Sequence, residues 1–134
     1  MATTYKFYHD AAGLQEITSS DPLLANSMTP EDKQIYLRTN DADIVGAQAD
    51  SDPGVDDIEV SAVDTGTGGS QPVTNVKLAT SLAGLATAVA GDPVALGPSI
   101  GTVFPVWVRY TPTGSEAVST NIVLRTNALL DTPA

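Results

Sequence analysis

Four aspartate residues, Asp50, Asp52, Asp56 and Asp57, gather in a short segment that also holds glycine and proline. Carboxylate oxygens are hard ligands of the kind that calcium ions prefer. The spacing does not fit an EF-hand loop, because Gly54 is misplaced and the closing glutamate is absent. A solvated acidic loop that keeps the protein soluble is the simpler interpretation. Calcium binding and docking of a partner are the alternatives, and we assign no metal-binding residue.

Other patterns that could support catalysis are weak. Paired carboxylates can hydrolyse glycosides in a cleft lined with aromatic side chains, but the chain has only seven aromatic residues. The single histidine, His9, has Asp10 beside it and Ser19 nearby, but no nucleophile-elbow string is present. The glycine-rich run 66–69 lacks the lysine of a phosphate-binding loop. We therefore predict no catalytic residue, no cofactor and no enzymatic activity.

Three aromatic residues, Tyr5, Phe7 and Tyr8, stand at the very start of the chain, where chains usually fray. Rigid aromatic side chains are common anchors of protein interfaces. One interpretation is a strand within the chain's own sheet, and the other is an arm that docks on another subunit. We take these three as candidate partner-binding residues. Arg38 and Arg125 are candidate charged contacts, because guanidinium groups bind carboxylates with two parallel hydrogen bonds.

The chain has 134 residues, no cysteine and a formal charge of −10. Such a length favours one domain, and the lack of cysteine excludes disulfides, thiolate catalysis and zinc–thiolate sites. Six basic residues do not make a nucleic-acid-binding surface, and an acidic chain is repelled by an anionic membrane. Residues 1–10 show no signal-peptide pattern, and no apolar run has the length of a membrane span. We expect neither nucleic acid nor membrane as a partner.

Alternation of apolar and polar residues, interrupted by turn residues, predicts a chain of short strands. In the strand 34–39, for example, Ile35 and Leu37 share one face. Proline lacks the N–H group that a sheet ladder uses, so Pro105 should stand at a sheet edge. We expect strands at 3–8, 14–18, 34–39, 57–63, 73–78, 93–96, 103–110 and 120–130, with 131–134 as a tail.

Residues 78–89 allow two interpretations. Leu78, Leu82, Leu85 and Val89 follow the spacing of a helical stripe. Gly84 and several β-branched residues weaken a helix at this place. We favour two short strands and keep the helix as the alternative.

A hexapeptide nearly repeats, as IYLRTN at 35–40 and IVLRTN at 122–127. Each copy places isoleucine and leucine inward and arginine outward, which indicates two strands in similar environments that could be neighbours. Strands separated by turns at these intervals are typical of an antiparallel β-sandwich. We expect a single domain over 1–134, with an N-terminal arm or hairpin and loop at 1–30 and the sandwich core at 31–130.

The order of these elements resembles the small immunoglobulin-like virion proteins of tailed bacteriophages. The resemblance is carried by the Val-Trp-Val-Arg strand end at 106–109, the Thr-Pro-Thr-Gly turn after it, and the closing Asn-Ile-Val-Leu-Arg strand at 121–125. The opening residues 5–13 and the strand 34–38 fit the same pattern. The resemblance implies an immunoglobulin-like β-sandwich with no enzymatic activity and no cofactor.

Proteins of this kind are often capsid decoration, or cement, proteins. The resemblance therefore implies a structural protein that is made in the host cytoplasm and sits on the outer capsid surface, where it binds the lattice of the major capsid protein. It also implies a homo-oligomer, often a trimer. One alternative is a tail, baseplate or fibre-associated sandwich. Another is a calcium- or carbohydrate-binding surface module, with Trp107, Tyr110 and Tyr36 as sugar platforms.

Overall fold

The computed structural model describes residues 4–18, 31–48, 56–66, 72–111, 121–127 and 129–133. Within these ranges the protein is all-β, as predicted, and its regular elements are strands and two short 3₁₀ helices. The strands are β1 (Lys6–Tyr8), β2 (Glu31–Arg38), β3 (Ile44–Gln48), β4 (Ile58–Asp64), β5 (Val76–Ala79), β6 (Val94–Gly97), β7 (Ser99–Ile100), β8 (Val103–Tyr110), β9 (Ile122–Thr126) and β10 (Leu129–Pro133). The 3₁₀ helices are η1 (Val73–Asn75) and η2 (Ala83–Ala86).

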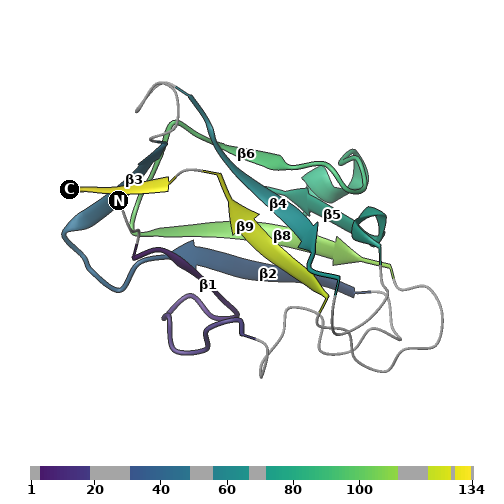
Figure 1. Cartoon of the computed structure of the whole chain (residues 1–134), viewed down its shortest axis with the longest axis horizontal. Helices are drawn as coiled ribbons and strands as arrows, with labels where there is room; N and C mark the ends of the chain where they lie inside the picture. Colours follow the sequence, from purple (N-terminus) through teal and green to yellow (C-terminus); the bar gives the residue numbers. More distant parts are fainter. Residues whose placement is uncertain are drawn as a thin grey trace.

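The first layer is a four-stranded antiparallel sheet with the order β1-β2-β8-β5. Strands β2 and β8 form its centre and run side by side along their whole length (Figure 1). Side chains alternate between the two faces of a strand, so Ile35 and its partner Val106 point inward together. Both side chains are completely buried. A shift of one residue would turn them to the solvent side, so their burial fixes the register of the two strands.

The second layer consists of two three-stranded ladders, β6-β4-β9 and β10-β3-β7. The same three stretches of chain supply both ladders, because β6 leads directly into β7 and β9 leads directly into β10. The central strands of the two ladders are β4 and β3, which residues 49–57 separate in the sequence. The second layer therefore draws its two ladders from three parts of the chain, which supply β3 and β4, β6 and β7, and β9 and β10.

Asn127 bridges the interruption between β9 and β10. Its backbone N–H donates to the carbonyl oxygen of Glu59 over 3.2 Å. Its side-chain Oδ1 accepts a 3.0 Å hydrogen bond from the N–H of Glu59, and its Nδ2 donates to the carbonyl oxygen of Asp57 over 3.1 Å. The side chain of Asn127 thus extends the hydrogen bonding between β9 and β4 by taking the place of a backbone partner.

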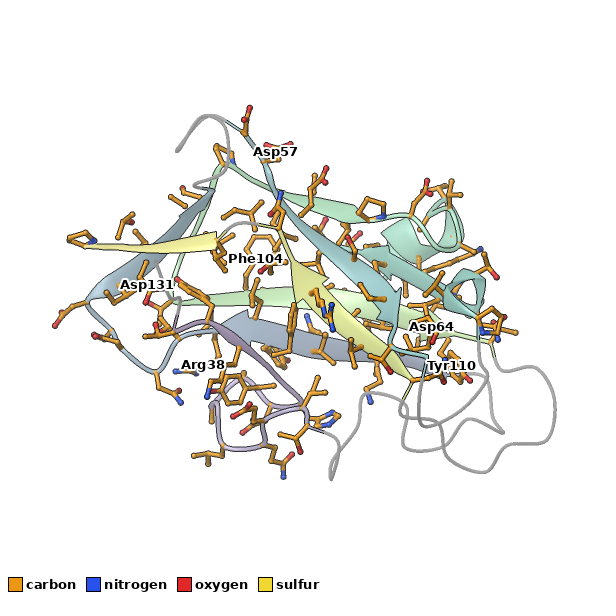
Figure 2. The ribbon with its side chains drawn as sticks, viewed as in Figure 1. Arg38, Asp57, Asp64, Phe104, Tyr110 and Asp131 are labelled. Carbon is orange, nitrogen blue, oxygen red and sulfur yellow. The ribbon has the colours of Figure 1, made fainter. Side chains whose placement is uncertain are left out.

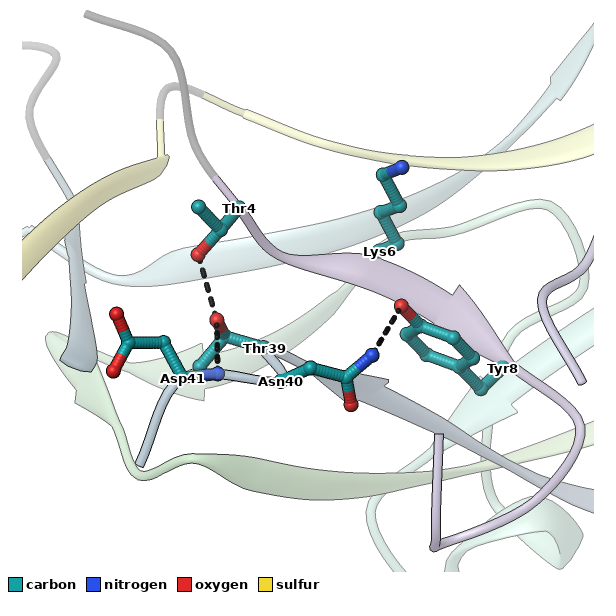
Figure 3. A pocket seen from close by; sticks show the side chains of 6 residues that line it. All are labelled: Thr4, Lys6, Tyr8, Thr39, Asn40 and Asp41. Carbon is teal, nitrogen blue, oxygen red and sulfur yellow. Dashed lines mark hydrogen bonds between the residues drawn. The ribbon is translucent and has the colours of Figure 1, made fainter. Parts of the chain in front are cut away.

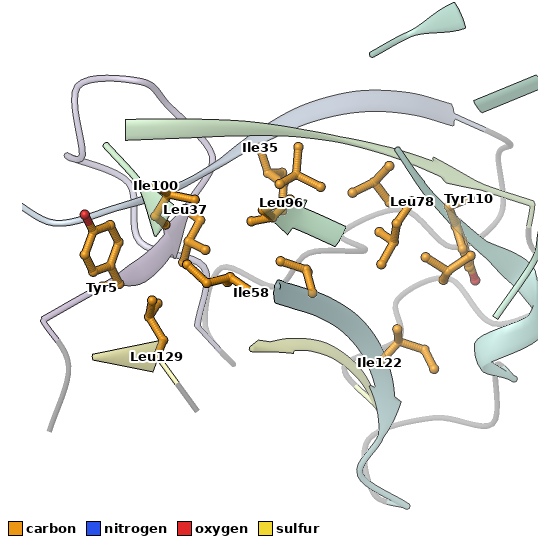
Figure 4. Packing of buried hydrophobic residues seen from close by; sticks show 14 residues of the cluster. Tyr5, Ile35, Leu37, Ile58, Leu78, Leu96, Ile100, Tyr110, Ile122 and Leu129 are labelled. Atoms are coloured by element: carbon orange, nitrogen blue, oxygen red, sulfur yellow. The ribbon is translucent and has the colours of Figure 1, made fainter. Parts of the chain in front are cut away.

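The core lies between the two layers. Residues from both are completely buried there, including Ile35 and Val108 from the first layer and Ile58 and Val60 from the second. Tyr5 and Tyr110 stand at opposite ends of this cluster (Figure 4). Each aliphatic side chain of this kind contributes about 1.5–3 kcal/mol when it is taken from water. One continuous core thus joins the N-terminal segment to the later strands.

Several predictions from the sequence are confirmed. The antiparallel β-sandwich is present, and β2, β4, β6 and β8 lie within a few residues of the predicted strands 34–39, 57–63, 93–96 and 103–110. Pro105 also lies at an edge, because β5 pairs with β8 only from Trp107 to Tyr110. The first half of β8 therefore has a ladder partner on one side only, and the missing N–H of Pro105 costs the sheet nothing there.

Residues 78–89 form neither of the two predicted structures. Strand β5 ends at Ala79, and the single-turn helix η2 follows at Ala83–Ala86. Leu85 is completely buried, whereas Leu82 and Val89 are 49% and 63% exposed. The apparent helical stripe was therefore wrong as a buried face, because two of its four members point to solvent. Residues 73–75, predicted as strand, form η1.

The C-terminal region also differs from the prediction. The expected strand 120–130 is divided into β9 and β10, which belong to different ladders. The expected tail 131–134 was wrong, because Asp131–Pro133 are paired with residues 44–46 of β3. The repeat strands β2 and β9 are not neighbours but lie in opposite layers. Strands β3 and β7 were not foreseen, and the short return strand 14–18 is reduced to one bridge between Tyr8 and Glu16.

Candidate functional site

The outer face of the first layer gathers most of the basic side chains of the chain. Residues paired across a ladder point to the same side of the sheet, so the registers identify this face. It consists of Lys6, Tyr8, Asp32, Gln34, Tyr36, Arg38, Lys77, Ala79, Val103, Pro105, Trp107 and Arg109. Four of the six basic residues of the protein are among them. We call this set the outer sheet face.

The outer sheet face has an uncharged centre between two basic ends. At one end Lys6 is paired with Arg38, and at the other end Lys77 is paired with Arg109. The residues between them are Gln34, Tyr36, Pro105 and Trp107, together with Ala79, which is buried against η2. A strand rises about 3.3 Å per residue, which separates the two basic ends by about 20 Å. Charge and apolar surface therefore alternate along the strands.

Arg109 and Asp32 form a bidentate ion pair between β8 and β2. The Nε and Nη2 groups of Arg109 donate to the two carboxylate oxygens of Asp32 over 2.9 and 3.1 Å. The hydrogen bond from Arg109 lowers the pKa of Asp32 and, reciprocally, raises the pKa of Arg109. Lys77 makes no ion pair with any residue that the structure describes. This end of the face therefore keeps an excess positive charge.

The turn 10–13 is folded against the other basic end. The carboxylate of Asp10 accepts hydrogen bonds from the N–H groups of Leu14 and Gln15, at 3.0 and 2.9 Å. Desolvation opposes ionisation of Asp10, but these backbone hydrogen bonds and the charge of Arg38 together lower its pKa. The carboxylate of Asp10 thus closes the turn and places a negative charge near Arg38.

Both basic side chains at this end are engaged. Arg38 donates from Nη1 to the carbonyl oxygen of Ala11 and from Nε to that of Thr39. Lys6 lies 3.6 Å from the carboxylate of Glu16, and both of these side chains are largely exposed. An exposed ion pair of this type contributes less than about 1 kcal/mol. The two ends of the outer sheet face therefore differ, because the turn 10–13 and Glu16 screen only one of them.

A shallow pocket of about 430 Å³ adjoins the Lys6–Arg38 end (Figure 3). It is lined by Thr4, Lys6, Tyr8, Thr39, Asn40 and Asp41. Most of its polar atoms already bond one another: the hydroxyls of Thr4 and Thr39 are 2.6 Å apart, and Asn40 Nδ2 donates to the Tyr8 hydroxyl over 3.3 Å. The pocket is open to solvent, and the side chain of Lys6 is part of its lining.

The three aromatic residues proposed as partner anchors lie mainly inside the protein. Tyr5 belongs to the hydrophobic core, and its hydroxyl donates to the carbonyl oxygen of Gly101 over 2.7 Å. Phe7 is partly buried against that core. Tyr8 points to the outer side but is buried, because the Glu16 bridge and Asn40 cover it. The interpretation as a strand of the chain's own sheet is confirmed, and Tyr5 and Tyr8 are not exposed anchors in this conformation.

The two arginines proposed as charged contacts lie in opposite layers. Arg38 is on the outer sheet face, and Arg125 is exposed on the outer side of the second layer, paired with Ser61. Figure 2 shows Arg38 at the same end of the molecule as Asp131 and at the end opposite to Tyr110. The structure therefore does not combine Arg38 and Arg125 in one site.

The acidic segment is only partly described. Asp56 and Asp57 are within the described residues, but Asp50 and Asp52 are outside them. Within the described ranges no three acidic or histidine side chains are grouped so as to hold a metal ion. Calcium binding by the Asp50–Asp57 segment stays a prediction.

Of the four basic residues at the ends of the outer sheet face, only Arg38 was predicted as a charged contact. Neither Lys77 nor the pairing of Arg109 with Asp32 was predicted. The available signal was alternation, which already placed Trp107 and Arg109 on one side of the strand 103–110. Which residues of other strands join them depends on register.

Comparison with known proteins adds no relative: no protein-family model, no curated protein and no solved structure matches this chain. The class is therefore set by the fold alone, an antiparallel all-β sandwich with a basic and aromatic outer sheet face. In the part of the chain that the structure describes, no helix is long and apolar enough to cross a membrane.

Proposed function

We propose that this chain is a structural protein of a tailed-bacteriophage particle that binds the outside of the assembled head as a decoration protein. The proposal rests on the resemblance of the strand order to such virion proteins and on one structural observation. That observation is the outer sheet face, where Trp107 and Tyr36 lie between two pairs of basic residues. Aromatic residues and arginine are the side chains most often found at the energetic centre of protein interfaces.

A sandwich of this kind would act by mass action and without chemistry. A protein that binds only the assembled shell stabilises the shell over its separate subunits, by an amount that grows with the ratio of concentration to dissociation constant. Many copies on one shell multiply a modest contribution from each. The partner is then the lattice of the major capsid protein, and the site of action is the outer surface of the virion.

The test is co-sedimentation with heads of the parent phage that lack this protein. We expect saturable binding to intact heads and no binding to free capsid subunits. Binding to purified tails or baseplates instead would place the protein with the tail, which is the nearest alternative. Sedimentation velocity on the purified protein tests the expected homo-oligomer, for which a trimer is the specific expectation.

A carbohydrate-binding surface module is the second candidate function. It is favoured by the position of Trp107 and Tyr36 on one face, next to the amide of Gln34. Tyr110, the third expected platform, is completely buried and faces the core, which removes it from such a site. Binding of neutral oligosaccharides with quenching of Trp107 fluorescence would favour this function over head decoration.

A further inference from the structure

We infer that the outer sheet face docks a carboxylate-rich surface of another protein, with Lys77 as its principal charged contact. The inference rests on the proposed function for the partner being a protein. The position of the contact and the sign of the partner's charge come from the residues of the face itself.

The positions of the basic residues lower the stability of the isolated protein, because like charges face each other across two ladders. Lys77 stands directly opposite Arg109, and Lys6 directly opposite Arg38, although the chain has sixteen acidic residues and only six basic ones. Like charges opposite each other across a ladder are destabilising. Lys6, Arg38 and Arg109 each have a compensating carboxylate nearby, but Lys77 has none among the described residues. A partner carboxylate would compensate the charge of Lys77, as Asp32 compensates that of Arg109.

Charge complementarity selects the partner. Removing the outer sheet face, which holds four bases and Asp32, leaves a chain whose net charge is more negative than the total of −10. The net charge of the rest of the molecule therefore disfavours an acidic partner, whereas the outer sheet face favours one. Complementarity of this kind orients the encounter and suppresses other binding modes.

The size of the face predicts a weak single contact. It extends about 20 Å along the strands and about 15 Å across them, which is well below the roughly 800 Å² per partner of a standard interface. Trp107 and Tyr36, both partly exposed, supply its apolar centre, and Val103 at its edge is 37% exposed. We therefore expect weak monovalent binding that becomes effective only when many copies bind one lattice.

The single tryptophan makes the inference directly measurable, because Trp107 lies in the middle of the face. We would titrate the full-length protein with poly-L-glutamate at low ionic strength and follow Trp107 fluorescence. The matched variants are Lys77→Glu and Arg125→Glu. Both change the net charge by the same amount, but Arg125 is exposed on the opposite layer. Lys77→Gln removes the charge without reversing it, and thermal unfolding checks that all variants are folded.

We expect the fluorescence change to saturate and to weaken as salt is added. Lys77→Glu should weaken binding by about tenfold or more, Lys77→Gln by less, and Arg125→Glu by no more than about twofold. Equal effects of Lys77→Glu and Arg125→Glu would overturn the inference, because binding would then follow net charge only. No binding of poly-L-glutamate, or tighter binding of polygalacturonate than of poly-L-glutamate, would also overturn it.

The proposed function and this inference fail separately. If heads bind the wild type and both glutamate variants equally, the protein is a decoration protein that docks through another surface. If poly-L-glutamate binds as expected but heads and tails do not, the acidic partner is a different protein. The head-binding assay is therefore run with the same three proteins.

Discussion

The hydroxyl group of Tyr5 donates a 2.7 Å hydrogen bond to the carbonyl oxygen of Gly101, just before β8 begins. Burial, reinforced by the nearby carboxylate of Asp131, raises the pKa of Tyr5, so the hydroxyl stays protonated and able to donate. The same carboxylate accepts a hydrogen bond from the N–H of Thr4 at 2.9 Å. The N-terminal segment is therefore attached both to the residues that lead into β8 and to the C-terminal strand β10.

Tyr5 should be important for stability. Replacing Tyr5 by phenylalanine removes only the hydrogen bond to Gly101 and should lower the free energy of unfolding by about 1 kcal/mol. Replacing it by alanine opens a cavity at the end of the core and should cost about 3–5 kcal/mol. Urea unfolding followed by Trp107 fluorescence measures both changes. If Tyr5→Ala were as stable as the wild type, the N-terminal segment would not be part of the fold.

Gly13 should tolerate a side chain poorly. Its φ of +74° is unfavourable for other residues, and a Cβ atom there would lie 2.7 Å from Arg38 Nε. Gly66 is the matched control, because it has a φ of +78° and no atom of the described residues lies within 4 Å of a Cβ placed there. Left-handed backbone alone costs an alanine about 1–2 kcal/mol, so both variants should be destabilised, and Gly13→Ala clearly more. Equal losses in thermal unfolding would mean that the turn 10–13 does not press against Arg38.

Asn127 should protect the middle of the second layer. Replacing Asn127 by alanine removes the side-chain hydrogen bonds to Glu59 N–H and to the carbonyl oxygen of Asp57, with an expected loss of about 1–2 kcal/mol. Hydrogen exchange of the Glu59 amide should become faster. The amide of Val63, whose partner in β9 is Val123, is the internal control and should change less. Unchanged exchange at Glu59 would contradict the role given to Asn127.

Stability should fall in mild acid, partly because of Asp64. Hydrogen bonds from the N–H of Gly66 (2.8 Å) and from Asn121 Nδ2 (3.1 Å) lower the pKa of Asp64 in the folded protein. A carboxyl group with a lower pKa in the folded state stabilises the fold above its unfolded pKa of about 3.9, and this contribution is lost as the pH falls through the folded pKa. Melting temperatures measured from pH 6 to pH 3 should fall less steeply for Asp64→Asn than for the wild type.

The control for this pH dependence is Asp92→Asn. Asp92 is an exposed carboxylate in the turn before β6. Its replacement by asparagine changes the net charge by the same amount as Asp64→Asn. If both variants flattened the slope equally, the effect would come from net charge and not from the hydrogen bonds of Asp64. Asp10 and Asp32, whose pKa values are also lowered, should add to the loss in the same pH range.

Alternation along single strands determined the general class of the protein. Ile35 and Leu37, and likewise Ile58 and Val60, are separated by one polar or aromatic residue, and all four are buried. Side chains of a strand alternate between its two faces, so the sequence of one strand shows which face is buried without knowledge of the neighbouring strands. Such local information was sufficient for the all-β sandwich and for the position of β8.

Which strands become neighbours was decided only in three dimensions. The pairing of Lys77 with Arg109 and of Arg38 with Lys6 creates the outer sheet face, and the pairing of Asp131 with Gly46 turns an expected tail into β10. The paired residues are far apart in the sequence, and no sequence pattern indicates that they are partners. Register is set by the fit of the whole core, and a shift of one residue would turn every side chain of a strand to the opposite face. For this reason the fold class could be predicted from the chain alone, whereas its candidate binding surface required the tertiary structure.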